Sequence, residues 1–284
     1  MQRLIEVKYI LFLPMLLTYS VSLSQTIKSD FSHIEIILDS ASFEKLVAND
    51  FIRTKFASCA YDTMLLSPLV LSYYINGEDN FIHFNPSRGY FATQRGTAYL
   101  IFQTLRPGQG KLLEQQLRKV AKDSIVSYDF TGPDFTLTEI VYNHHDRLSN
   151  KPTNNLIPML SSYSVESFRK WGLGDSVEVS VREFLSSSVS TNKLFEKIVS
   201  IELAITQKEL QDLFPVLELV GYRKKKNKFI KPNEPTISYI ISDQLNEPKI
   251  KKLTLSLTED VRKQNFDFGG VNLTIVKNRA QFNF

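Results

Sequence analysis

The sequence predicts an α+β protein built from repeated β-α-β-β-β modules with mixed, largely antiparallel sheets. Residues 33–38 alternate between polar and apolar side chains and then run directly into a helix start. The same pattern occurs again further along the chain, and one constant offset aligns Ile34 with Ile201 and Glu35 with Glu202. Short strand-like segments separated by turn signals follow both helices.

The first 24 residues are expected to be a secretory signal peptide and to lie outside the fold. The stretch "MQRLIEVKYILFLPMLLTYSVSLSQT" has a basic start, an apolar run and small residues at cleavage-site spacing. A membrane anchor is the alternative, but a span needs ~20 apolar residues and this run is shorter. We therefore expect an exported protein, periplasmic or extracellular, with no membrane span in the mature chain.

The composition indicates an ordinary folded protein and argues against nucleic-acid binding. The chain has 284 residues, 43% of them hydrophobic and 23% charged, and a net charge of only +4. The basic cluster "YRKKKNKFIKP" is flanked by apolar segments and is interpreted as a solvated hairpin or edge strand. Cys59 is the single cysteine, so no intramolecular disulfide can form.

In the first module, the strand at 33–38 should present two different faces. His33, Glu35 and Ile37 point one way, whereas the intervening residues Ile34, Ile36 and Leu38 point the other. Asp39 is the predicted N-cap of a helix that packs over the apolar face. An Asn-Gly pair marks a hairpin turn further on. The expected elements are a helix at 41–56 and strands near 59–65, 69–75 and 80–85.

The second module completes a paired unit over residues 25–190, and a third module covers residues 191–284. Residues 143–190 are expected to be mainly an irregular loop region, because prolines and an Asn-rich run break the pattern. Thr206 and Glu209 form a capping box ahead of the third-module helix. Expected second-module elements are strands at 96–105, 125–130 and 136–142, a helix at 111–122 and short helices at 165–171 and 177–185. Expected third-module strands are 228–230, 237–242, 253–257, 271–276 and 280–284.

Four segments carry a resemblance to a known superfamily: "HIEIILDSASFEKLVANDFIRTKFA", "DNFIHFN", "EIVYNHHDRL" and "FDFGGVNLTIVKNRAQFNF". Together they resemble the vicinal-oxygen-chelate (glyoxalase-like) superfamily and, more narrowly, an uncharacterised family of secreted bacterial glyoxalase-like proteins. The resemblance implies paired modules around a cleft, with a metal-ligating His on the first strand of a module and a Glu on the fourth. His33 matches the first-strand position. His83 stands near the position of the Glu, and Ser200 replaces the His of the third module.

Strand alternation places a set of candidate ligand-binding residues on the cleft face. His33, Glu35, Phe81 and His83 would supply polar groups and one ring. Further candidates are the apolar wall residues Tyr99 and Ile101, together with His144. His33, His83 and Glu35 could together hold a divalent transition metal such as zinc, nickel or iron.

Two classes of function remain open, and no catalytic residue is assigned. The incomplete ligand set favours a protein that binds a small organic ligand in the cleft without a cofactor. The alternative is a metal-dependent lyase, isomerase or dioxygenase-type enzyme, in which the ion polarises a substrate oxygen. A structural protein with a vestigial cleft is a third reading. The sequence contains no H-E-x-x-H, G-x-S-x-G, P-loop or G-x-G-x-x-G motif.

Overall fold

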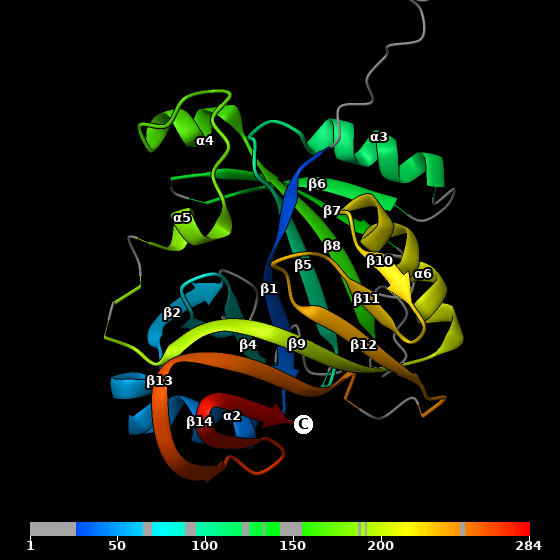
Figure 1. Ribbon diagram of the computed structural model, residues 1–284. Helices are drawn as coiled ribbons and strands as arrows, with labels where there is room; N and C mark the ends of the chain where they lie inside the picture. The colour runs from blue at the N-terminus through cyan, green and yellow to red at the C-terminus, as the bar shows by residue number, and fades with distance from the viewer. Residues whose placement is uncertain are drawn as a thin grey trace, which may run out of the picture.

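Two mixed β-sheets and a small number of helices form the protein, which confirms the α+β class (Figure 1). The computed structural model describes residues 27–64, 70–88, 95–120, 125–132, 134–142, 155–186, 189–190, 192–244 and 248–284. The predicted signal peptide, residues 1–24, lies outside these ranges. Within them, no helix has the length and apolar character needed to cross a membrane.

The larger sheet has eight strands in the order β2-β3-β4-β1-β5-β8-β7-β6. Its two central strands, β1 (Ser29–Leu38) and β5 (Ala98–Thr104), pair antiparallel. On their outer sides, β1 pairs in parallel with β4 and β5 pairs in parallel with β8. The remaining strands are β2 (Ser58–Met64), β3 (Val70–Asn76), β4 (Phe81–Pro86), β6 (Ile125–Thr131), β7 (Thr136–Tyr142) and β8 (Leu156–Tyr163).

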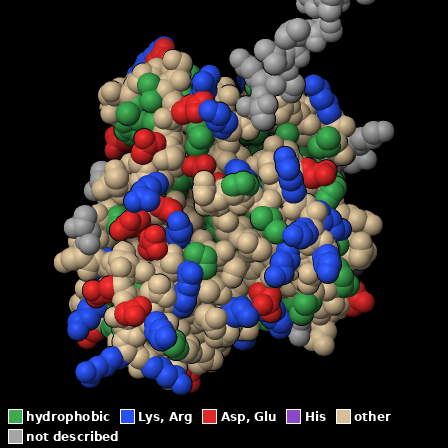
Figure 2. All heavy atoms as spheres, in the orientation of Figure 1, with side chains coloured by type: hydrophobic (Ala, Val, Ile, Leu, Met, Phe, Trp, Pro, Cys, Tyr) green, Lys and Arg blue, Asp and Glu red, His purple; other side chains and the backbone are tan. Residues whose placement is uncertain are grey.

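The smaller sheet has six strands in the order β10-β11-β12-β9-β13-β14. Here β9 (Phe195–Ile205) pairs in parallel with β12 and antiparallel with β13. The basic cluster is the hairpin β10–β11 at the sheet edge, as predicted. The other strands are β10 (Arg223–Lys225), β11 (Lys228–Ile230), β12 (Thr236–Ile241), β13 (Ile250–Asp267) and β14 (Asn272–Asn283). Positive and negative side chains are interspersed over much of the face seen in Figure 2.

In the two strand-helix segments that align in sequence, the strands end and the helices begin at equivalent positions. β1 ends at Leu38 and α2 (Ser40–Ala48) follows, with Asp39 as the N-cap that accepts a hydrogen bond from the Ser42 amide. β9 ends at Ile205 and α6 (Gln207–Leu219) follows, with the capping box on Thr206 present as predicted. The other helices are α3 (Gly110–Val120), α4 (Val165–Lys170) and α5 (Val181–Leu185).

The helix predicted over residues 41–56 is interrupted, which corrects that prediction. α2 stops at Ala48, and Asn49 has an extended backbone with φ −72° and ψ 116°. The Asn49 side chain accepts a hydrogen bond from the Ile52 amide, so it starts a new turn where the first helix ends. The chain then continues as a short π-helix over Ile52–Phe56.

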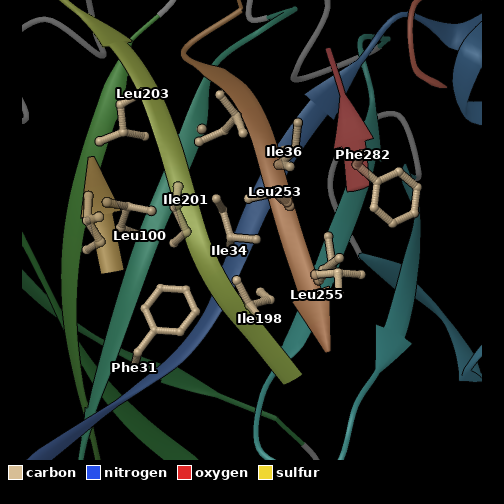
Figure 3. Packing of buried hydrophobic residues seen from close by; sticks show 14 of the residues in the cluster. Phe31, Ile34, Ile36, Leu100, Ile198, Ile201, Leu203, Leu253, Leu255 and Phe282 are labelled. Atoms are coloured by element: carbon tan, nitrogen blue, oxygen red, sulfur yellow. The ribbon is translucent and has the colours of Figure 1, made fainter. Parts of the chain in front are cut away.

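The main core lies between the two sheets. Ile34 and Ile36 on β1 are almost fully buried, as the alternation predicted. They lie against Ile201 of β9 and Leu253 of β13 (Figure 3). The sequence assigned this face to helices alone. In the structure the second sheet covers much of it, and Leu46 of α2 packs into the same core.

Residues 143–190 are more ordered than the expected irregular loop region. Strand β8 (Leu156–Tyr163) lies inside this range and pairs with both β5 and β7. The sequence analysis did not predict this strand, because Pro158 argues against a strand in the interior of a sheet. β7 pairs only from Met159 onward, so the missing amide proton of Pro158 leaves no ladder bond unmade on that side. The short helices expected here are present as α4 and α5.

The two strands predicted at 271–276 and 280–284 form one long strand, β14, which pairs with the long strand β13. Two strands were predicted because the strand-like pattern is interrupted by polar residues between them. In the structure Lys277 takes a positive φ of 55°, and the register shifts between Ser256, Val261 and Gln264. These irregularities let one curved hairpin continue past the polar stretch.

The first residues of β1 are held by side chains where a neighbouring strand is missing. β4 pairs with β1 only from His33 onward. Before that point, Glu234 accepts a hydrogen bond from the Phe31 amide at 3.2 Å, and Lys231 donates to the Ser29 carbonyl. Lys231 also pairs with Glu234 at 3.3 Å. The loop between β11 and β12 therefore holds the two sheets together at this edge.

Glu234→Gln is expected to make stability less dependent on pH. Burial raises the pKa of Glu234 to about 7; Lys231 opposes the rise and the charge of Asp30 adds to it. The folded state therefore holds this proton more tightly than the unfolded chain. The associated stability is present below the unfolded pKa and is lost as the pH rises through about 7. Glutamine keeps an acceptor for the Phe31 amide and removes the titrating group. The pH-dependent part of the stability that is removed is at most about 3 kcal/mol.

Urea unfolding of wild type and Glu234→Gln at pH 5 and pH 8 measures this effect. The exposed carboxylate Glu44, whose side chain is 67% accessible, provides the matched control Glu44→Gln. The stability difference between Glu234→Gln and wild type should shift in favour of the variant at pH 8. Parallel pH profiles for wild type and Glu234→Gln would contradict the prediction.

Candidate functional site

Several polar residues that were predicted as site candidates lie on one face of the larger sheet. His33 and Glu35 lie on β1, on the side opposite to the core residues. In the parallel β1–β4 register, Glu35 stands beside His83. Tyr74 of β3 stands on the other side of His83. Since strand alternation sends these side chains to the same face, β1, β4 and β3 together build a polar surface, called here the polar face.

A chain of hydrogen bonds fixes the carboxylate of Glu35. The Ser72 hydroxyl donates to Asn85 Oδ1 at 2.6 Å, and Asn85 Nδ2 donates to Glu35 Oε1 at 2.6 Å. Asn85 and Ser72 are fully buried. The other carboxylate oxygen of Glu35, Oε2, lies 3.7 Å from His83 Nδ1. Glu35 is thereby oriented toward the imidazole of His83.

Both imidazoles on the polar face stack on aromatic neighbours. The His33 ring lies parallel to Phe81, with centroids 4.1 Å apart, and the His83 ring lies parallel to Tyr74 at 4.3 Å. The two imidazole centroids are 6.4 Å apart. Stacking on neighbours within the sheet restricts the rotation of both imidazoles, so the positions of their nitrogens are set by the fold.

Burial keeps both histidines neutral near pH 7. Desolvation lowers the pKa of His83 to about 3, against an opposing contribution from Asn85. Desolvation and then the neighbouring His83 hold the pKa of His33 well below its usual range. A neutral imidazole has one N–H donor and one nitrogen lone pair. These rings can therefore accept a hydrogen bond or bind a metal without first losing a proton.

His83 has an unused nitrogen. Its side chain is only 5% exposed, and Nε2 has no hydrogen-bond partner among the described residues. A proton on Nδ1 would face the Glu35 carboxylate, which leaves Nε2 as an acceptor. Buried polar atoms in folded proteins are nearly always hydrogen-bonded. The unpartnered Nε2 thus marks a position where a donor group is missing.

An apolar cluster adjoins the polar face on the same side of the sheet. Tyr99 and Ile101 of β5 stand beside Glu35 and His33 in the β1–β5 register. Both belong to a buried cluster separate from the main core; its members are Ile37, Tyr99, Ile101, Val141, Ile157 and Met159. The cluster is contributed by β1, β5, β7 and β8, so polar and apolar groups meet at the centre of the eight-stranded sheet.

His33, Glu35 and His83 are also the candidate metal ligands. Within the described ranges, no set of three or more His, Cys, Asp or Glu side chains is placed to hold an ion. His83 Nδ1 lies 3.7 Å from Glu35 Oε2, and the Nδ1 atom of His33 is within hydrogen-bond distance of the Ser32 hydroxyl, at 3.0 Å.

The structure brings most of the predicted site residues together. His33, Glu35, Phe81 and His83 share the polar face, whereas Tyr99 and Ile101 belong to the adjoining apolar cluster. His144 lies outside the described residues. Alternation places Asn85 on the same strand face as His83, but Asn85, Ser72 and Tyr74 were not among the predicted site residues. Ser72 and Tyr74 can be found only from the β3–β4 register.

Comparisons with known proteins give a family and no activity. No curated protein matches the chain. A solved structure of a "putative dioxygenase" from Bacillus subtilis strain 168 is similar over 87% of this chain and 81% of its own, with 12% identity and a TM-score of 0.29. That score is too low to support an argument about fold or chemistry. A family model covers residues 31–284, and the chain therefore belongs to a family of unknown function, DUF5829.

Proposed function

We propose that the polar face and the adjoining apolar cluster bind a small, partly apolar organic ligand, and that binding needs no metal ion. The observation that carries the proposal is the buried, unpartnered Nε2 of His83. A ligand hydroxyl or N–H would donate to this nitrogen, while its apolar part would lie against Tyr99 and Ile101. A few fixed polar groups beside apolar walls are typical of small-molecule sites.

The charge of the polar face limits the ligand further. Glu35 is the carboxylate of the group, and both imidazoles are neutral at pH 7. An anionic ligand would meet a fixed carboxylate without a cation on His33 or His83 to offset it. A neutral ligand that carries hydrogen-bond donors fits this surface better.

A metal-dependent lyase, isomerase or dioxygenase-type enzyme is the second candidate. The observation in its favour is that His83 has one ring nitrogen, Nε2, without a partner among the described residues. Its other ring nitrogen, Nδ1, lies 3.7 Å from the Glu35 carboxylate. Neutral imidazole and carboxylate are both ligands for zinc and for non-haem iron. In that case His83, Glu35 and His33 would hold the ion, and the ion would supply Lewis-acid polarisation of a substrate oxygen.

We also infer that the three strand-helix segments are repeats of one glyoxalase-like module. The support is shared connectivity: in each, a strand, a helix and three further strands follow in order, and the first strand pairs in parallel with the last, as β1–β4, β5–β8 and β9–β12. Fold resemblance alone does not transfer chemistry, because one fold hosts many activities.

Ligand binding at the polar face is tested by thermal shifts from a panel of metabolites, with and without a chelator. Ligand-induced shifts should persist in chelator and disappear in the His33→Ala/His83→Ala double variant. Phe130→Ala removes an aromatic ring from a half-exposed position of β6 and serves as the control. Shifts that vanish with chelator in wild type would instead identify the metal-dependent enzyme. Shifts that survive the double substitution would place the ligand elsewhere.

Export is the remaining part of the proposal. Its support is the signal-peptide pattern of residues 1–24. Terminal sequencing of the protein recovered outside the cytoplasm should give a chain that begins at about Gln25. An intact Met1 on such protein would contradict the assignment.

A further inference from the structure

A cavity lies between the two sheets, away from the polar face. Its volume is about 500 Å³. The first residues of β1, the β3–β4 turn and the start of α5 form one side; the end of α6 and the β11–β12 loop form the other. This size is in the range of small-molecule pockets.

The cations in the wall of this cavity are already paired. Lys28 contacts Glu178 at 2.8 Å and Arg182 contacts Asp79 at 3.1 Å. Lys231 contacts Glu234 at 3.3 Å. With each positive charge matched by a carboxylate, the wall offers little free positive charge to an anion.

Asp30 is the exception among the charged groups of the wall. Its carboxylate accepts one hydrogen bond, from the Val181 amide at 3.3 Å, and the described part of the chain gives it no ion pair. Glu234 lies near enough for the two carboxylates to repel each other, and Lys231 is the cation that pairs with Glu234. The end of the cavity formed by Asp30 and Glu234 therefore has an excess of negative charge.

Two buried hydroxyl groups at the same end have no hydrogen-bond partner in the part of the chain that the structure describes. Ser29 lines the cavity, is only 5% exposed, and its Oγ is unpartnered. The Tyr222 hydroxyl is buried and unpartnered as well, and the Lys231 ammonium group lies 5.9 Å from the centroid of the Tyr222 ring. Burial, followed by the charges of Glu234 and Asp30, holds the pKa of Tyr222 well above its usual range, which agrees with a negative local potential. Two unpartnered hydroxyl groups close to the Asp30 carboxylate indicate that a polar group of a ligand could bind here.

We propose that this cavity binds a small organic molecule that carries a primary ammonium group on a compact apolar body. The ammonium group has three N–H donors. Asp30, Glu234 and the Ser29 hydroxyl offer acceptors for them at one end of the cavity. The apolar body would lie against the side chains of Ile27, Leu105 and Leu219. The ligand would contact both sheets at the edge where Lys231 and Glu234 hold β1.

Three probes with one ring and different charge test the proposal on the full chain: benzylammonium, benzyl alcohol and benzoate. Titration followed by ligand-observed NMR should show saturable binding of benzylammonium and much weaker binding of the other two. Equal binding of benzyl alcohol would show that the charge plays no part. Preferred binding of benzoate would make the cavity an anion site. Either result, or no binding of benzylammonium, would overturn the proposal.

Substitutions locate the binding. At pH 8, above the pKa of about 7 of Glu234, Asp30→Asn and Glu234→Gln each remove one charge while keeping an oxygen acceptor for Val181 and Phe31. Each should weaken benzylammonium binding by at least about tenfold, because hydrogen bonds to charged groups are the strong ones. Glu44→Gln, at an exposed site on α2, should leave binding unchanged, and circular dichroism checks the fold of every variant. Unchanged affinity in both cavity variants would also refute the site.

Discussion

Ile36→Ala should lower the free energy of unfolding by about 2–5 kcal/mol, since it removes buried methyl and methylene groups and leaves a cavity in a close-packed core. Ile36 is 2% exposed and lies between the two sheets. Its neighbours come from β1, β9, β13 and β14, so the cavity cannot close by movement of one loop (Figure 3). Urea unfolding measures the loss.

The same substitution at Ile240 is the matched control. Ile240 also lies in a strand, but its side chain is 49% exposed, so Ile240→Ala should cost less than about 1 kcal/mol. On the opposite face of β1, Glu35→Ala removes the acceptor of Asn85 and should cost about 1–2 kcal/mol. Equal unfolding midpoints for Ile36→Ala and Ile240→Ala would show that the core is not where the structure places it.

Lys249→Met should be as damaging, at about 3–5 kcal/mol, because it leaves a carboxylate without its cation in a buried site. Lys249 Nζ lies 3.0 Å from Glu209 Oε2, with side chains 2% and 13% exposed. Glu209 also accepts from the amides of Leu156 and Thr206. One carboxylate therefore ties the start of α6 to β8 of the other sheet, and its orientation depends on Lys249.

Lys252→Met provides a control with the same chemistry at the surface. Lys252 and Glu202 are also 3.0 Å apart, but their side chains are 35% and 39% exposed. Solvent screens such a pair, and its loss should cost between 0 and about 1 kcal/mol. Chemical denaturation of the two variants side by side tests the difference. Similar losses for both would mean that burial does not decide the strength of the Lys249–Glu209 pair.

The sequence by itself determined the features that depend on neighbouring residues. The helix starts at Asp39 and Thr206 follow from side chains that bond to amides three residues away. The two faces of residues 33–38 follow from strand alternation, and this alone placed His33 and Glu35 opposite the core. The basic hairpin at 223–230 was found in the same way.

Only the tertiary structure decided which distant segments meet. β8 was missed because Pro158 argues against a central strand until the limited pairing of β7 is known. The polar face needed the register of β3 and β4, since Ser72 reaches Glu35 only through Asn85. The cavity beside Asp30 forms where the β11–β12 loop meets the unpaired edge of β1. Strand partners far apart in sequence are selected by complementary packing across the whole core, and no local pattern encodes that choice.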